Sequence, residues 1–320
     1  MDSAKAGDNI EILVDRTPFY GESGGQVGDS GKAFNENVQI ELLDTVKPLP
    51  ELIVHKAKIT TGSISTGDSL KMLVNKTTRN DTALNHSATH LLHAALKEVL
   101  GDHIKQAGSL VAPDRLRFDY THFSPLTEKE RKKIESQINE KIRENIPVST
   151  KEMEIEEALK EGAMALFGEK YGEQVRVVTV PGFSMELCGG THVSATGDIG
   201  LFRIVYEGGI ASGVRRIEAV TGKTAYEKAH SEYETLTTIR SLIKAPSDEE
   251  VSKLKKLLDK NRELEKEITV LKEKMISGNE SSEKDNIQKL GDVSLLIKNL
   301  DGTDAKTLRT YIDNAKNKLK

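Results

Sequence analysis

The sequence predicts an α+β fold, built from a small N-terminal β-barrel, a two-layer α/β domain, a helical hairpin or coiled coil, and the start of another α/β domain. Two observations predict this order. Short segments of alternating or β-branched residues, separated by Gly and Asp turns, occupy residues 1–77 and recur between residues 109 and 220. Longer charged segments have apolar residues at helical spacing. The predicted boundaries are 1–77, 78–222, 223–282 and 283–320.

Residues 1–77 contain segments that are typical of barrel strands. The predicted strands cover residues 10–14, 38–43, 52–59 and 69–74. Between the first two strands, four glycines lie within the segment Gly21–Gly28. This loop is either a plain strand connection or a place where the backbone approaches a ligand closely.

The segment 78–222 alternates between helix and strand patterns, which predicts one α/β layer domain. A helix is expected over residues 78–100, and a second helix begins after Thr127, which forms a capping box with Glu130. Pro147 ends that second helix. A short helix starts at residues 156–160, and the strands are expected at 109–111, 115–120, 148–150, 175–180, 200–206 and 215–220.

From Lys223 onward the sequence becomes helical and charged. Apolar residues hold a and d positions from Leu254 to Met275, over about three heptads, with Asn261 at an a position. This pattern predicts either an antiparallel hairpin or a coiled coil. A polar linker (277–282), a strand (293–300) and a helix (304–320) follow. Because a strand and a helix without a returning strand cannot close a core, we expect the sequence to be a piece of a longer protein.

Composition excludes several classes of protein. The chain is 37% hydrophobic and 30% charged, and it has neither an apolar run of about 18 residues nor a secretory leader, so no membrane partner is expected. One cysteine excludes an intrachain disulfide and fits the reducing cytoplasm. The net charge of −4 means that local basic patches would have to hold any RNA.

Two short motifs predict a metal site. His86 and His90 are four residues apart in the first predicted helix, so both imidazoles lie on one face. Cys188 and His192 have the same spacing, beside a pair of glycines. One sulfur and three nitrogens form a ligand set that suits zinc. His93 shares the helix face and is either a rival ligand or a buried neighbour.

Six motifs, taken together, resemble the alanyl-tRNA synthetase family. They are RTPFYGESGGQ (16–26), NHSATHLLH (85–93), AMALFGEKY (163–171), ELCGGTH (186–192), GDIGLF (197–202) and GVRRIEA (213–219). The resemblance runs over nearly the whole chain, and the helical region distinguishes it from free-standing deacylases that share the metal motif. It implies an editing domain at residues 78–222 and, within residues 283–320, the start of a tRNA-binding domain near Asp292.

The resemblance implies proofreading. The expected activity is hydrolysis of tRNA(Ala) that carries the wrong amino acid, chiefly serine and also glycine. One zinc ion per chain would be held by His86, His90, Cys188 and His192. Four protein ligands usually indicate a closed structural site. We favour an open or expandable site, in which His192 is the least certain of the four ligands. The rival interpretation is a non-catalytic tRNA-binding or dimerising chain with a structural zinc.

The resemblance also places Gln106 in the editing pocket, where a neutral amide would orient water or the aminoacyl group. Thr17 and Thr191 are candidates for contact with a serine hydroxyl or else turn residues. Arg215 and Arg216 either meet phosphate or lie on a solvated edge. The tripeptide Gly24-Gly25-Gln26 matches one in peptide-release factors, but three residues are a weak signal, so no role is assigned to it.

The expected partners are tRNA(Ala) and its mischarged forms, with a homodimer through the helices of residues 223–275. The family's ATP-dependent ligase domain would lie upstream of Met1. ATP and nucleotide binding are therefore expected only of the longer protein.

Overall fold

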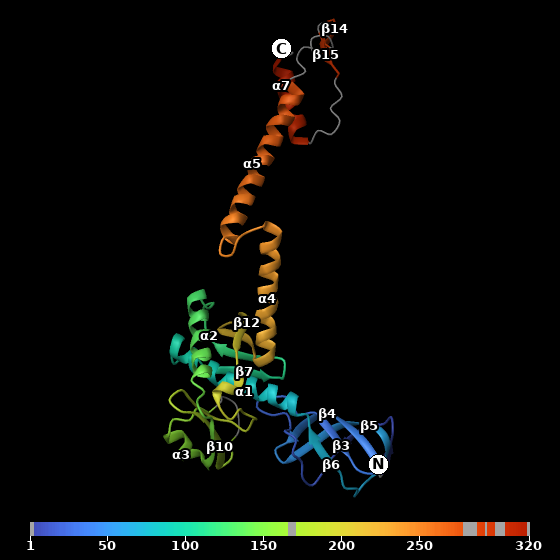
Figure 1. Ribbon diagram of the computed structural model, residues 1–320, viewed down its shortest axis with the longest axis vertical. Coiled ribbons are helices and arrows are strands. Elements are labelled where there is room, and N and C mark those ends of the chain that lie inside the picture. Colours follow the sequence, from blue (N-terminus) through green and yellow to red (C-terminus); the bar gives the residue numbers. More distant parts are fainter. Residues whose placement is uncertain (1–2, 166–170, 278–286, 292, 298–304, 319–320) are drawn as a thin grey trace. The chain divides into compact units, whose positions relative to one another are not determined.

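The computed structural model describes residues 3–165, 171–277, 287–291, 293–297 and 305–318. They fall into two compact units, residues 1–231 and 232–320, each of which is described by itself. The first unit contains three separate sheets with helices, and the second contains helices and a two-stranded sheet (Figure 1). The predicted mixture of helices and sheets is confirmed, whereas the four predicted domain boundaries stay predictions.

The N-terminal sheet is open, so the predicted barrel is not confirmed. Its strands are β1 (Ser3–Lys5), β2 (Asn9–Ile12), β3 (Gly31–Phe34), β4 (Val38–Leu49), β5 (Leu52–Ser65) and β6 (Lys71–Val74). They pair antiparallel in the order β1-β5-β4-β3-β6, and β2 joins the outer edge of β5. Closure would need β6 to pair with β1 or β2, and no ladder among the described residues does this. β1 and β3 escaped prediction because they are short and lack an apolar alternation.

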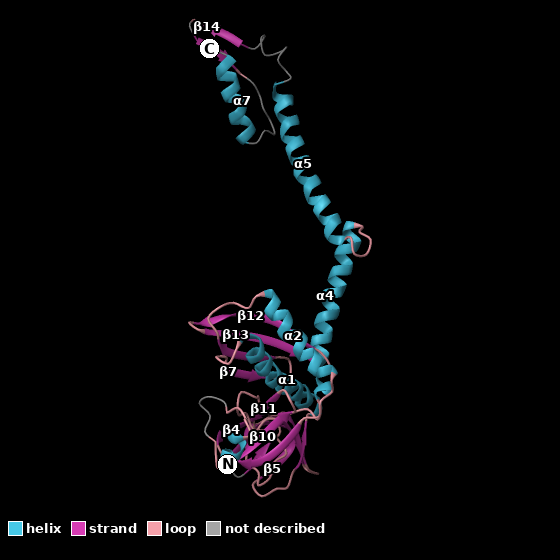
Figure 2. Cartoon of the chain, turned by 90° about the vertical axis from the view of Figure 1, so that its left-hand side faces the viewer, coloured by secondary structure: helices cyan, strands magenta, loops and turns pink. Residues whose placement is uncertain are grey.

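The second sheet carries the helix that bears the histidines. Its strands are β7 (Gln106–Val111), β8 (Leu116–Thr121), β12 (Phe202–Ala211) and β13 (Val214–Thr221), in the order β12-β13-β8-β7. Helices α1 (Lys76–Leu100) and α2 (Glu128–Arg143) both pack against this sheet (Figure 2). The Asn75 side chain caps α1 by accepting from the Thr78 N–H, and Gly101, with φ of 113°, ends it.

Helix α2 is confirmed with its capping box. The Thr127 hydroxyl accepts from the Glu130 N–H, and the Glu130 carboxylate accepts from the Thr127 N–H. Its predicted apolar face is buried, because Ile134, Ile138 and Ile142 are each at most 3% exposed. These three residues share one hydrophobic core with α1 and the second sheet.

A third sheet corrects the prediction of a single α/β layer. Strands β9 (Ser149–Glu154), β10 (Gln174–Val180) and β11 (Ser184–Leu187) pair in the order β11-β10-β9, with helix α3 (Ile155–Lys160) beside them. These strands form a small core of their own, in which Ala158, Val177 and Leu187 are buried. The predicted strands between residues 148 and 220 are therefore divided between two sheets. A short 3₁₀ turn, η1 (Thr196–Ile199), precedes β12.

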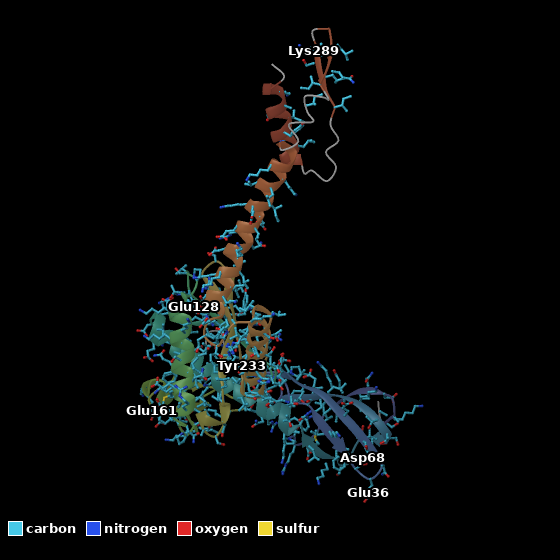
Figure 3. The ribbon with its side chains drawn as sticks, turned by 45° about the horizontal axis from the view of Figure 1, so that its top comes forward. Glu36, Asp68, Glu128, Glu161, Tyr233 and Lys289 are labelled. Atoms are coloured by element: carbon cyan, nitrogen blue, oxygen red, sulfur yellow. The ribbon has the colours of Figure 1, made fainter. Side chains whose placement is uncertain are left out.

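Helix α4 (Gly222–Ile243) leads into the second unit, which contains α5 (Glu250–Ser277), β14 (Ile287–Leu290), β15 (Val293–Leu296) and α7 (Ala305–Lys318). Every side chain from Val251 to Lys272 is exposed (Figure 3). The predicted hairpin or coiled coil is therefore not confirmed. The predictions for residues 278–282, 298–300, 304 and 319–320, and for motif residues 166–170, fall outside the described part of the chain. None of the described helices is long and apolar enough to cross a membrane.

Candidate metal centre

The four side chains that the two motifs single out meet in one cluster. His86 and His90 come from α1, and Cys188 and His192 come from the segment after β11. One ligand atom from each residue lies within 4.8 Å of the others. Among the described residues, this group of side chains could hold a metal ion. The spacing in the sequence therefore predicted the grouping in space.

Helix α1 presents its histidines from inside the protein. Fourteen of its residues between Thr82 and Leu96 are buried, including both histidines. The His86 and His90 rings lie edge to face with their centroids 5.3 Å apart, as expected for neighbours one turn apart. The His192 ring closes the group, at 4.4 Å from His86 and 4.6 Å from His90.

Backbone contacts hold the cysteine segment against this helix. The Cys188 N–H donates to the carbonyl of Arg176 on β10 (2.9 Å). The Arg176 guanidinium in turn donates to the carbonyls of Cys188 (3.0 Å) and Gly190 (2.6 Å). A β-carbon at Gly190 would collide with the His86 ring, so glycine is the residue that lets the segment come this close.

The donor atoms fit a zinc ion. Cys188 Sγ lies 3.3 Å from His86 Nε2 and 3.3 Å from His192 Nε2. Tetrahedral bonds of about 2.3 Å to sulfur and about 2.0 Å to nitrogen place ligand atoms roughly 3.5 Å apart. The cluster is therefore compatible with zinc in both chemistry and size.

The charges of the cluster favour the metal-binding form of the cysteine. Burial alone would raise the pKa of the Cys188 thiol. The electrostatic interaction with His86, together with hydrogen bonds to His192 and His86, outweighs burial and holds that pKa well below its ordinary value. Burial, reinforced by the neighbouring His86, lowers the pKa of His192 to about 3. Thiolate sulfur and neutral imidazole are the forms that bind zinc.

Two polar side chains fix the outer nitrogens of the histidines. Gln26 Oε1 lies 2.7 Å from His86 Nδ1, and Ser87 Oγ lies 3.1 Å from His192 Nδ1. In both rings Nε2 is then the nitrogen that faces the cysteine sulfur. Partners of this kind orient the ring of a ligating histidine and select its tautomer.

The buried carboxylate of Glu186 contacts His90 and a third histidine of α1, His93. Glu186 is 2% exposed; its Oε2 lies 3.6 Å from His90 Nε2 and its Oε1 lies 3.2 Å from His93 Nδ1. Burial alone would raise the pKa of Glu186, but His90 and His93 outweigh it and lower that pKa. The same pairing overcomes the burial of His90 and raises its pKa to about 9. His93 thus pairs with Glu186 and lies outside the four-residue cluster.

Hydrogen bonds among the described residues join Thr191 to the partners of the cluster, and none joins Thr17 or Gln106 to it. The Thr191 N–H and hydroxyl donate to Gln26 Oε1 (2.9 and 3.2 Å). The Thr17 hydroxyl accepts from the N–H of Phe19 in a local turn. Gln106 is half-buried at the first position of β7, and no hydrogen bond among the described residues joins it to the cluster.

Arg215 and Arg216, the candidates for phosphate contact or a solvated edge, both pair with carboxylates. Arg215 is 9% exposed and donates to Glu207 Oε1 (2.5 Å), and this bond raises its pKa. Arg216 donates to both oxygens of Asp119 (2.7 and 2.8 Å). In this conformation each guanidinium therefore already has an anionic partner within the sheet.

Gln26 and Glu186 are the residues that sequence reasoning missed. Gln26 lies 60 residues from His86 in the chain, and no spacing rule links the two. The cluster of glycines around it was the signal that could have found it. Glu186 is two residues before Cys188, between Met185 and Leu187 in β11, and a carboxylate between apolar residues was a usable signal.

Comparisons with known proteins agree with these features. The model "tRNA synthetases class II (A)" matches residues 1–78, and the model "Threonyl and Alanyl tRNA synthetase second additional domain" matches residues 175–218. Alanine–tRNA ligases of Shewanella amazonensis and Xanthomonas campestris pv. campestris are each 50% identical to all of this chain, which covers 36% of their length. The ligase of Xanthomonas axonopodis pv. citri is 48% identical with the same coverage. The chain therefore belongs to the alanyl-tRNA synthetase family and spans about a third of the length of these relatives.

Proposed function

We propose that the chain removes wrongly attached amino acids from tRNA(Ala). The bond broken is the ester between the amino acid, chiefly serine and also glycine, and a ribose hydroxyl at the 3′ end of the tRNA. The cofactor is one zinc ion, held by His86, His90, Cys188 and His192. The observation that carries the proposal is this cluster in a chain of the alanyl-tRNA synthetase family. Two of its members, Cys188 and His192, lie in the matched segment 175–218.

The chain's own residues prepare the site. When bound, zinc would polarise an ester oxygen or lower the pKa of a water molecule. Arg176 fixes the cysteine segment, and Ser87 orients the ring of His192. Glu186 holds His90 from the side of the protein core. These contacts order the ligands before substrate arrives, which reduces the reorganisation that the reaction requires.

Gln106 is proposed as the residue that orients the attacking water or the aminoacyl group. Its half-buried place at the first position of β7 leaves part of the side chain open to a ligand. As a neutral amide it can donate and accept hydrogen bonds but cannot serve as a base. The Thr191 hydroxyl donates to Gln26 and can still accept a hydrogen bond from a serine hydroxyl.

The direct test is deacylation of Ser-tRNA(Ala) by the purified chain. With zinc present, seryl ester should be lost faster than in buffer, and a chelator should abolish the difference. Ala-tRNA(Ala) is the matched substrate control and should survive. A chain that contains zinc and yet leaves Ser-tRNA(Ala) intact would contradict the proposal.

The second candidate is a tRNA-binding or dimerising chain whose zinc is purely structural. The observation in its favour is the count of four protein ligands, which usually closes a zinc site. The variant Gln106→Ala separates the two functions when metal content and folding are unchanged. Loss of turnover with retained tRNA binding supports the deacylase; unchanged turnover removes Gln106 from the mechanism. ATP–pyrophosphate exchange would test for ligase activity, which we assign to the longer relatives.

The proposed dimer would form through the helices of residues 223–275. The exposed leucines of α5, among them Leu254, Leu257 and Leu264, supply an apolar surface for a second copy. Sedimentation at increasing protein concentration would measure this association.

A further inference from the structure

We propose that Gln26 is a positioning residue for the metal centre, so that the N-terminal sheet and its loop help to build the zinc site. The proposal rests on the metal site in the proposed function but not on its hydrolytic activity. The carrying observation is a single buried amide oxygen that serves both halves of the ligand set. Gln26 is 1% exposed and comes from the loop between β2 and β3.

The hydrogen-bond pattern fixes which atom of Gln26 faces the cluster. The backbone N–H of Thr191 points at the end of the side chain (2.9 Å) and can only donate. The atom that faces it must therefore be the carbonyl oxygen, Oε1, and not the amide nitrogen. The Thr191 hydroxyl (3.2 Å) and His86 Nδ1 (2.7 Å) meet the same oxygen.

This assignment determines the tautomer of His86. A ring nitrogen 2.7 Å from an amide oxygen must carry a proton, so Nδ1 is the N–H of the ring in its neutral, zinc-binding form. Nε2 then keeps its lone pair, and it is the nitrogen 3.3 Å from Cys188 Sγ. Without an acceptor at Nδ1, the ring would gain access to the other tautomer, which has no lone pair at Nε2 for a metal.

The loop that carries Gln26 is held on both sides. The Val111 N–H donates to the Gly25 carbonyl (2.7 Å), and the Val27 N–H donates to the Val111 carbonyl (3.0 Å). Gly25 has φ of 81°, and a β-carbon there would crowd the carbonyl of Ser109. The two residues that flank Gln26 are thereby attached to β7, which limits the directions in which its side chain can point.

Gln26 therefore connects parts of the ligand set that are distant in sequence. His86 lies on α1, and Thr191 lies between Cys188 and His192, which are the two ligands of the other half. The Gln26 Oε1 atom accepts from the ring of His86 in the first half and from the backbone N–H of Thr191 in the second. Removing that oxygen would leave three donors without a partner in a buried place, which loosens both halves together.

The test compares two substitutions in the full chain. Gln26→Leu keeps the approximate size but removes the acceptor, and Gln26→Glu keeps an acceptor for all three donors. Zinc affinity, measured by competition with a chelator, should fall by roughly 10–100-fold in Gln26→Leu and stay within about threefold of wild type in Gln26→Glu. Gln137→Leu, at a glutamine on α2 that binds Glu98, is the matched control and should change nothing.

The visible spectrum of the cobalt-substituted protein provides a readout of ligand geometry. Gln26→Leu should shift the cobalt bands, and Gln26→Glu should restore the wild-type pattern. Wild-type zinc affinity in Gln26→Leu would overturn the proposal. Equal losses in the Leu and Glu variants would also overturn it, since the oxygen would then have no specific role.

A measurement on the unmodified chain covers the case in which Gln26→Leu does not fold. Imidazole nitrogen shifts of His86 in the zinc-loaded protein should show the proton on Nδ1, and a proton on Nε2 would overturn the proposal. None of these readouts involves deacylation. A chain that binds zinc through this arrangement and fails to hydrolyse Ser-tRNA(Ala) would refute the proposed function and leave the role of Gln26 standing.

Discussion

Helices α1 and α5 have similar lengths, 25 and 28 residues, and opposite surroundings. In α1 a continuous stretch from Thr82 to His93 is buried, and much of it is polar. In α5 every side chain from Val251 to Lys272 is exposed, and its leucines recur at heptad spacing. The helix with the clear apolar repeat is therefore the exposed one, and the buried helix carries histidine, serine, threonine and asparagine inside the protein.

The difference shows what a buried polar helix requires. Each polar group that α1 buries has a partner: Asn85 donates to the carbonyl of Ala112, and Ser87 accepts from the N–H of Val193. The partners of Asn85 and Ser87 lie outside α1, so the packing of the first unit satisfies these buried groups. For α5, the apolar repeat indicates a helix and a surface but identifies no partner.

Loss of a metal ligand should produce the largest difference in behaviour between helices α1 and α5. Cys188→Ala should weaken zinc binding by at least about 100-fold, because one ligand of four carries roughly a quarter of the about 10–16 kcal/mol of a structural site. Hydrogen exchange in the zinc-loaded state should then accelerate along α1 and remain unchanged along α5. His103→Ala, at an exposed histidine outside the cluster, is the control. Uniform acceleration in both helices would show that the metal supports the whole chain.

A matched pair of leucines tests the contrast in burial. Leu92 on α1 is 0% exposed, and Leu264 on α5 is 43% exposed. Leu92→Ala should lower the free energy of unfolding by about 3 kcal/mol, whereas Leu264→Ala should change it by less than about 0.5 kcal/mol. Chemical denaturation at low protein concentration measures both. A large loss in Leu264→Ala that grows with protein concentration would show that a second copy covers α5, as the proposed dimer requires.

The sequence predicted local features of this molecule better than its long-range contacts. The helix of His86 and His90, the capping box of Thr127 and each half of the metal cluster depend on short spacings, which is why they could be found. The barrel prediction rested on short, regularly spaced strands with Gly and Asp turns, and local composition does not specify which strand edges pair. Gln26 and Glu186 were missed because their roles depend on residues brought together by the fold.

Removal of the Glu186 carboxylate, which contacts His90 on α1, should have a smaller effect on the free energy of unfolding, with a defined pH dependence. Burial alone would lower the pKa of His90, but the Glu186 charge, followed by Cys188, outweighs burial and raises that pKa from 6.5 to about 9. In the zinc-free protein, this contribution to stability is fully present below pH 6.5 and is lost as pH rises through about 9. Glu186→Gln should remove it, at a cost of about 1–3 kcal/mol at neutral pH.

An NMR titration of the His90 ring in the zinc-free chain is the direct measurement. The midpoint should move down from about 9 in Glu186→Gln, since burial then acts without the opposing carboxylate. A midpoint that does not move would assign the charge on His90 to Cys188 instead, and the thermal stability of the variant should then equal that of wild type at neutral pH.

The N-terminal sheet offers a buried histidine with an incomplete set of partners, in contrast to those of α1. His55 is 0% exposed, and burial lowers its pKa. The Thr45 hydroxyl donates to the carbonyl of Asp29, so His55 Nδ1 must donate to that hydroxyl, and its buried Nε2 has no partner among the described residues. Protonation would place an unpaired N–H and a charge in this core.

Because the pKa of His55 in the folded chain lies below its unfolded value of 6.5, its contribution to stability is present above pH 6.5 and is lost as pH falls. Unfolding free energy should therefore decrease from pH 7 to pH 5 by less in His55→Gln than in wild type, with a difference below about 1.4 kcal/mol per pH unit, the limit for one proton. Comparing the two proteins at both pH values cancels the other titrating groups, which they share. Parallel pH profiles would mean that His55 gains a partner for Nε2 in solution, and the sheet would then satisfy its buried histidine as completely as α1 does.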